Sequence, residues 1–317
     1  MSNQTQLEAS KKHRPRKFKR GDWVQVRSLE EIQAALDAEG KNEGIPFMPE
    51  MIKYCGRKFR VARRADHIFL DRLCYVARLK NTVFLGDLRC DGKAHGGCQM
   101  GCQLFWKEAW LKPADPPTAQ ELVPPKVDLV SLELPTTTPE RFTCQATELV
   151  RATTRLPWWD VRQYISDLRL GETTFKELFV EFVKRGKDKF LRIIKKKQYS
   201  VVGNLKNQPT PTENLNLREG DWVEVRSLEE ILATLDAKGR NRGLGFGSDQ
   251  AAFCGKRYRV AGRVEKIILE WSGEMKTVAN TVKLDELTCH GRMCRSCPRN
   301  CLHLWREIWL KRVPGPQ

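Results

Sequence analysis

Apolar and polar residues alternate along Gly21–Arg27 (GDWVQVR), which predicts a half-buried β-strand near the start of the chain. Ser28 follows in the place of a helix N-cap, and Glu31 stands three residues later, so the pair predicts a capping box. Apolar residues then recur at three- and four-residue spacing along Leu29–Leu36, and Gly40 supplies a stop. The pattern therefore predicts a strand followed by a short amphipathic helix.

Two further strands are expected after an irregular loop. The first is Lys58–Arg64, and the second lies near Thr82–Leu85. The segment Trp106–Trp110 is too short for its spacing to decide between helix and strand. Together these segments predict a small, mostly β unit with one short helix.

The same pattern returns later in the chain. Residues 21–112 align with residues 220–311 at a constant offset of 199, and 41 of the 92 aligned positions are identical. The opening GDWVQVRSLEEI returns as GDWVEVRSLEEI, YCGRKFRVA as FCGKRYRVA, and FWKEAWLK as LWREIWLK. The chain is therefore a tandem duplication, and residues kept in both copies can be compared within one sequence. The recurring tryptophans of these motifs favour core packing.

The composition between the copies predicts the remaining organisation. Residues 1–20 form a basic arm without structure, 113–140 a Pro- and Thr-rich linker, and 200–219 a second linker. Residues 141–199 show apolar spacing of three to four and predict a helical segment. The expected fold class is α+β, with two small β-barrel-like modules joined by helices. The opening G-D-x-V-x-V resembles the first strand of SH3-like barrels, which implies that each module is such a barrel.

Cysteines cluster once in each copy. The first cluster has the spacing C-x4-H-x2-C-x3-C and the second C-x4-C-x2-C-x3-C. The offset of 199 places each residue opposite its counterpart, with His facing Cys at one corner. The eight candidate metal ligands are Cys90, His95, Cys98, Cys102, Cys289, Cys294, Cys297 and Cys301.

Four sulfur or imidazole ligands at such spacing predict a closed tetrahedral zinc site, and therefore two zinc ions per chain. An iron–sulfur cluster is the alternative, because C-x4-C-x2-C also occurs in plant-type ferredoxins. Buried thiols without metal are the third interpretation. That interpretation does not explain why the cysteines lie in glycine-rich, basic and non-periodic sequence such as CDGKAHGGC.

One more cysteine is kept in both copies. Cys55 and Cys254 each precede a predicted strand, within a motif of an aromatic residue, Cys, Gly and two basic residues. Three interpretations stay open for this pair. The thiol is a buried structural side chain, an extra metal ligand, or a reactive nucleophile whose pKa two neighbouring cations lower.

The formal net charge is +17, and it is concentrated in two places. Residues 1–20 carry seven basic residues and one glutamate. The second run contains the cations Lys184, Arg185, Lys187, Lys189, Arg192, Lys195, Lys196 and Lys197. Such a run is a solvated helix face, or it contacts nucleic-acid phosphates or an anionic membrane surface.

The sequence contains no nucleotide-binding loop, zinc-protease motif or nucleophile elbow, and each cluster has its four corners filled by protein side chains. We therefore expect binding rather than catalysis. No apolar stretch is long enough to predict a transmembrane helix, and the N-terminal residues do not resemble a secretory signal. Clustered cysteines without export predict a reducing cytoplasm.

The shared motifs GDWV-x-V-R-S, C-G and W-L-K, together with the clusters, resemble an uncharacterised bacterial family of duplicated cysteine-rich modules. The resemblance implies a bacterial cytosolic protein and no particular activity. Our leading hypothesis is a zinc-binding scaffold with a protein or nucleic-acid partner. The alternatives are an iron–sulfur redox accessory protein, a nucleic-acid-binding regulator, and an enzyme that uses Cys55 or Cys254 as a nucleophile. The sequence leaves the oligomeric state open.

Overall fold

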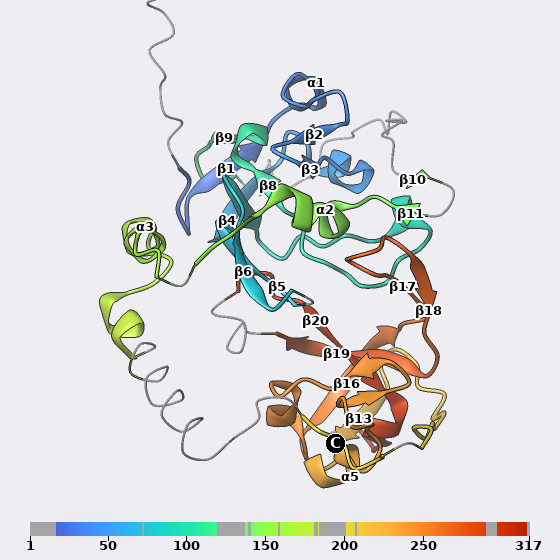
Figure 1. Ribbon diagram of the computed structural model, residues 1–317. Helices are drawn as coiled ribbons and strands as arrows, with labels where there is room; N and C mark the ends of the chain where they lie inside the picture. Colours follow the sequence, from blue (N-terminus) through green and yellow to red (C-terminus); the bar gives the residue numbers. More distant parts are fainter. Residues whose placement is uncertain are drawn as a thin grey trace, which may run out of the picture.

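The computed structural model describes residues 17–71, 73–118, 137–138, 141–157, 159–180, 183, 201–206, 208–289 and 297–315. Helices and antiparallel strands are both present, so the fold is α+β, as predicted. Figure 1 shows two bodies, one built from residues in blue and green and the other from residues in orange and red. We call residues 21–112 the first module and residues 220–311 the second module.

The first module contains a five-stranded antiparallel sheet in the order β8-β7-β4-β1-β9. Its strands are β1 (Trp23–Val26), β4 (Lys58–Arg64), β7 (Thr82–Leu85), β8 (Trp106–Lys107) and β9 (Leu111–Pro113). Strands β4 and β7 have the bounds that the sequence predicted. The ambiguous tryptophan segment is part strand and part 3-10 helix.

The second module contains a sheet with the equivalent order β20-β19-β16-β13-β21. Its strands are β13 (Trp222–Val225), β16 (Arg257–Arg263), β19 (Thr281–Thr288), β20 (Leu302–Arg306) and β21 (Leu310–Arg312). Each strand overlaps its counterpart at the 199-residue offset, so equivalent residues occupy equivalent places in the two sheets.

Short helices follow the first strand of each sheet. Helix α1 (Leu29–Gln33) begins at Ser28 and helix α5 (Leu228–Leu232) at Ser227, each with the predicted capping box. Helix α1 ends at Gln33 instead of continuing to Gly40. The side chain of Asp37 accepts the backbone N–H groups of Glu39 and Lys41, which turns the chain away from the helical path.

The remaining short elements connect these strands. In the first module they are β2 (Lys41–Asn42), β3 (Ile45–Pro46), η1 (Pro49–Tyr54), η2 (Lys93–His95) and η3 (Glu108–Trp110). In the second they are β14 (Arg240–Asn241), β15 (Leu244–Gly245), η5 (Gln250–Phe253) and η6 (Glu307–Trp309).

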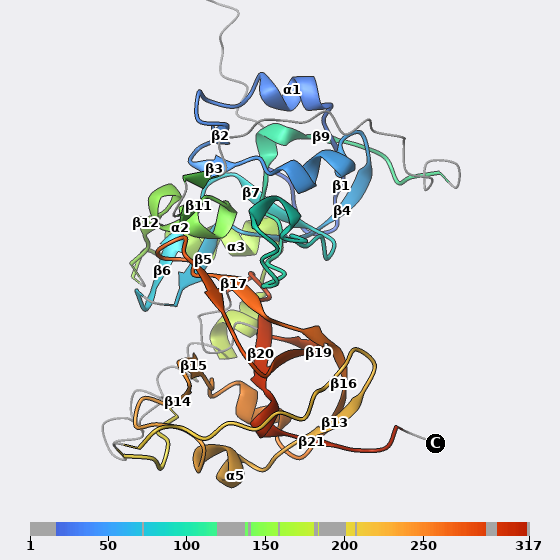
Figure 2. The same cartoon turned by 90° about the vertical axis from the view of Figure 1, so that its right-hand side faces the viewer.

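A β-hairpin projects from each sheet toward the other module. The first hairpin consists of β5 (His67–Leu70) and β6 (Tyr75–Arg78), and the second of β17 (Lys266–Ile268) and β18 (Met275–Thr277). Figures 1 and 2 show β17 and β18 extending from the second module to the first.

The segment between the modules is only partly helical where it is described. It contains β10 (Thr137–Thr138), β11 (Arg141–Phe142), α2 (Gln145–Ala152), β12 (Thr154–Arg155) and α3 (Arg162–Leu170). Much of it packs on the first module. Strand β12 pairs with β6, and the Gln145 amide bonds the backbone of Pro46 and Phe105.

Four of the six recurring tryptophans belong to the two cores, whereas Trp23 and Trp222 are only half-buried. Trp106, Trp110, Trp305 and Trp309 are completely buried. A buried carboxylate stands beside each pair, because Glu108 accepts from Arg64 (2.6 Å) and Glu307 accepts from Arg263 (2.7 Å). The retained W-x-E-x-W motif is thus explained by packing and by an ion pair to a buried glutamate.

Candidate metal centres

The first cluster folds into a compact loop between β7 and β8. The backbone N–H of Cys90 donates to the carbonyl of Cys102 (2.9 Å), which closes the loop at its base. Within it, η2 is flanked by Gly92 and Gly96, both at positive φ. These glycines allow a reversal that L-residues rarely adopt, so residues 12 positions apart in sequence return to one place.

All four residues predicted for this cluster border one small cavity of about 30 Å³, together with the unpredicted Glu50 and Cys144. The residues that line it are Met48, Glu50, Cys90, His95, Cys98, Met100, Gly101, Cys102, Gln103, Leu104, Phe105, Cys144, Gln145, Ala146 and Ile268. A water molecule needs roughly 10–15 Å³ of such space. The cavity therefore has room for a metal ion or for about two to three water molecules, and it is too small for an organic substrate.

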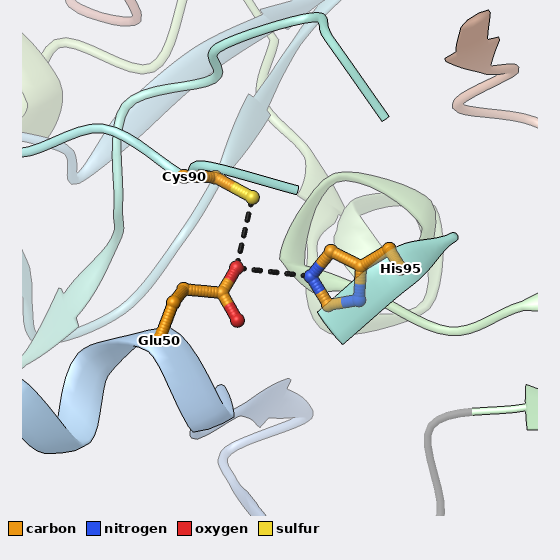
Figure 3. Close-up of side chains that lie close together, drawn as sticks. All are labelled: Glu50, Cys90 and His95. Carbon is orange, nitrogen blue, oxygen red and sulfur yellow. Dashed lines mark hydrogen bonds and ion pairs between the residues drawn. The ribbon is translucent and has the colours of Figure 1, made fainter. Parts of the chain in front are cut away.

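Glu50, Cys90 and His95 lie closest together within this cavity (Figure 3). Their ligand atoms are all within 4.8 Å of one another. Cys90 Sγ donates to Glu50 Oε1 (2.8 Å), and His95 Nε2 lies 3.0 Å from the same oxygen. His95 is only 1% exposed, and its Nδ1 atom and Glu50 Oε2 are buried without a hydrogen-bond partner among the described residues. Two buried atoms of ligand type without a hydrogen-bond partner fit the donor set of a metal site.

Glu50 was missed by the sequence analysis because it lies 40 residues before the cluster. It is placed by η1, whose first turn sits under the loop. The signal that points to it is the duplication: its counterpart at the 199-residue offset is Asp249, also an acid. Glu50 is buried and Asp249 is half-buried, and an acid kept beside the cluster in both copies marks either a metal ligand or a carboxylate that orients one.

Burial makes the cavity a poor place for isolated negative charge. It raises the pKa of the Cys90 thiol, and the nearby Glu50 carboxylate raises that pKa further. Burial also raises the pKa of Cys102, and that of Cys301 to about 11. For Glu50, burial opposes ionisation, but hydrogen bonds from His95 and Cys90 outweigh it and hold the pKa below its ordinary value. A bound divalent cation would balance these charges directly.

The second cluster begins in the same way, since the N–H of Cys289 donates to the carbonyl of Cys301 (2.7 Å). The side chain of Cys289 bonds Asp249, as Cys90 bonds Glu50. Cys297 is buried, and it lies close enough to Cys301 to raise the pKa of the Cys301 thiol. Cys294 lies outside the described residues. Of the other three predicted ligands, Cys297 and Cys301 are neighbours, whereas Cys289 approaches Cys301 through its backbone and Asp249 through its side chain.

The two clusters meet at the junction of the modules, and each is bonded by the hairpin of the opposite module. The N–H of Ile268 in β17 donates to Cys98 Sγ (3.3 Å). The N–H of Phe69 in β5 donates to Cys297 Sγ (3.2 Å). The residue numbers of the two donors differ by 199, and so do those of the two acceptors. The two contacts are therefore equivalent and related by an approximate two-fold arrangement.

Further contacts close the junction without this symmetry. The Gln99 side chain accepts from the backbone of Glu265 and Lys266 (2.6 and 3.0 Å), whereas its counterpart, Pro298, has no such amide. Arg299 is buried between the clusters, pairs with Glu270 (2.7 Å), and lowers the pKa of both Cys102 and Cys301 against the effect of burial. Its counterpart is Met100. Arg299 is thus a cation that lies near both clusters, and only the second module supplies it.

Cys55 and Cys254 stand apart from the cavity. Cys55 is buried in the core of the first module, at the end of η1, and burial raises its pKa to about 11. Burial also raises the pKa of Cys254. A thiol with a raised pKa is a weak nucleophile at neutral pH, so these environments favour a structural role. Cys144 lines the cavity from the N-terminus of α2, and burial raises its pKa as well.

The predicted polyanion-binding run, Lys184 to Lys197, lies outside the described residues. Within the part of the chain that is described, no helix is both long and apolar enough to cross a bilayer. No protein-family model, curated protein or solved structure matches this chain. Its function is therefore argued from the clusters themselves.

Proposed function

We propose that this protein is a non-enzymatic metal-binding scaffold that holds one zinc ion in each cysteine cluster. The observation that carries the proposal is the 30 Å³ cavity, which Cys90, His95, Cys98 and Cys102 all line together with Glu50. In this proposal the four side chains are the ligands. Glu50 accepts from the imidazole and fixes its orientation, as carboxylates commonly do for zinc-bound histidines.

Zinc is favoured over an iron–sulfur cluster by the ligand chemistry and by the available space. The cavity suits one ion, and imidazole with thiolates is an ordinary zinc donor set. Iron–sulfur clusters are held mainly by cysteine thiolates, and histidine ligands are characteristic of a special class. Four protein ligands leave no open position, which supports a structural ion rather than a catalytic one.

The contacts between each cluster and the hairpin of the opposite module support a scaffold role. Because each thiol accepts a hydrogen bond from the opposite hairpin, two ions would fix the cluster loops and, through them, the relative placement of the modules. In this proposal the modules are SH3-like barrels, the compartment is the bacterial cytoplasm, and the basic run beginning at Lys184 recruits a protein or nucleic-acid partner. Nucleic-acid binding of this kind should weaken steeply with added salt.

Anaerobic purification followed by metal analysis and a visible spectrum tests the proposal. We expect a colourless protein with about two zinc ions per chain, one for each closed four-ligand site. Cys98→Ala should lower the content to about one ion, whereas the exposed Cys74, outside both clusters, serves as a control whose replacement by alanine changes nothing. A brown protein with iron and sulfide would support the redox alternative, and a protein without metal would refute both.

A further inference from the structure

The two clusters differ by a pair of opposite substitutions. Where the first cluster has His95, the second has Cys294. Where the first module has Leu104, two residues after its last cluster cysteine, the second has His303. Histidine is therefore lost at one position and gained at another, and the question is whether the two imidazoles occupy equivalent places.

The position of Leu104 shows where residue 303 points. Leu104 lines the cavity of the first cluster beside Cys90 and His95. Residue 303 is the equivalent position of the second module, because Gln103 pairs with Arg89 as Leu302 pairs with Thr288. A histidine side chain is long enough to place a nitrogen donor at a ligand position from there, whereas a leucine side chain has no donor atom.

The contacts of His303 match this expectation. Its Nε2 atom lies 3.2 Å from Asp249 Oδ2, and only 11% of its side chain is exposed. The same Asp249 carboxylate is bonded by Cys289. In the first cluster, Glu50 bonds both Cys90 and His95. Each cluster thus contains its first cysteine, an acid and an imidazole, although the imidazole comes from a different segment of the chain.

His303 is also held rigidly. It lies on β20, and its ring packs on the rings of Phe253 (5.9 Å between centroids) and Trp305 (6.4 Å). Both ring contacts are edge-to-face, and a ligand held on a strand by such packing needs little ordering when a metal binds. By contrast, the corresponding position in the first module is filled by a buried leucine, so its imidazole comes from the loop itself.

We propose that the second centre binds its metal through Cys289, Cys297, Cys301 and His303, with Asp249 orienting the imidazole, and that Cys294 is not a ligand. This inference rests on the proposed function, because it assumes that the clusters hold metal. The ion is a borderline divalent cation such as zinc, for which three thiolates and one imidazole form an ordinary tetrahedral set. Both centres then have the same donor atoms, and only the order of the ligands along the chain differs.

The test compares His303→Ala with Cys294→Ser in the full chain, by zinc content and by the visible spectrum after cobalt substitution. We expect Cys294→Ser to keep about two ions and an unchanged cobalt spectrum, and His303→Ala to retain about one ion. His303→Cys separates loss of a ligand from misfolding: it should restore the second ion and strengthen the sulfur-to-cobalt absorption. His67→Ala is the control, since His67 lies near Asp167 (3.7 Å) and lines neither cluster.

The outcomes distinguish this inference from the proposed function. If the unaltered protein binds no metal, the proposed function fails. If it binds about two ions and His303→Ala keeps both, or if Cys294→Ser alone loses one, the proposed function stands and the assignment of His303 is refuted.

Discussion

Gly92 offers a sharp test of how the first cluster is built. It begins the 3-10 turn that carries His95, with φ of 70°. A Cβ atom at this position would lie 1.8 Å from the carbonyl oxygen of Cys98 and 2.7 Å from its carbonyl carbon. Carbon atoms do not approach closer than about 3.0 Å, and the obstacle is backbone that cannot rotate away. Gly92→Ala must therefore displace Cys98 by more than 1 Å.

Gly97 in the same loop provides the matched control. Its φ is 79°, yet a Cβ atom there meets nothing within 4 Å. Both substitutions place alanine in the left-handed region, which costs about 1–2 kcal/mol. That cost alone corresponds to roughly 5- to 30-fold weaker zinc binding. Gly97→Ala should show about this loss, because it contains only the conformational term.

Gly92→Ala should lose the first zinc ion altogether. Ligand positions must be kept within about 0.5 Å for a metal site to keep its affinity, and the required displacement of Cys98 is larger. The assay is zinc content per chain after dialysis, together with affinity measured by competition with a chelator. Equal zinc affinities for the two alanine variants would refute this account, because the close approach of Gly92 to Cys98 would then have no consequence.

Three further predictions concern the junction, the core and the response to acid. In Cys297→Ala, the Phe69 amide loses its acceptor and should exchange its hydrogen at least about 2- to 10-fold faster, whereas Cys74→Ala should leave it unchanged; unaltered exchange in both would contradict the cross-module bond. Glu307→Gln should lower the free energy of unfolding, measured in urea, by about 3 kcal/mol, because an amide group then faces Arg263 and buried N–H donors. Glu224→Gln removes an exposed pair with Arg257 and should change the free energy of unfolding by less than about 1 kcal/mol. Similar losses in the two variants would be inconsistent with the pairing of the buried Glu307 carboxylate. A hydrogen bond from Lys311 and the capping bonds of Ser227 lower the pKa of Glu230 from 4.5 to about 2. The unfolded chain therefore binds the proton more readily, and the stabilisation is lost as pH falls from about 4.5 toward about 2. Glu230→Gln should be less stable than the unaltered protein at neutral pH, and urea titrations should show this difference shrinking over that pH interval. A difference that stays constant with pH would argue against this role of Glu230.

Local sequence signals predicted much of each module. Alternation and capping identified β4, β7 and the starts of α1 and α5, because these elements are determined by neighbouring residues. The length of α1 was wrong, since the turn centred on Asp37 overrides the apolar spacing that continues to Leu36. The segment after residue 140 was predicted as helical, but part of it pairs as β12 with β6, a contact between residues far apart in sequence.

Part of the candidate site was also predicted from residues that are close together in the sequence. Cys90, His95, Cys98 and Cys102 lie within 13 residues, so their spacing alone suggests a common ion. Glu50 belongs to the same cavity but is brought there by η1, and no local spacing connects it to the cluster. His303 was likewise overlooked, because registering the copies position by position cannot reveal an imidazole supplied from another position.

By itself, the sequence determined that one unit occurs twice, that both units combine strands with a short capped helix, and that each carries clustered candidate metal ligands. These properties depend on composition and on spacing along a few turns of chain. The tertiary structure alone decided that the clusters face each other and that β5 and β17 bond the sulfur atoms of the opposite module. It also decided that Glu50 and Asp249 stand beside the first cysteine of each cluster. Such contacts join residues up to 228 positions apart, and they arise only when the two modules pack together.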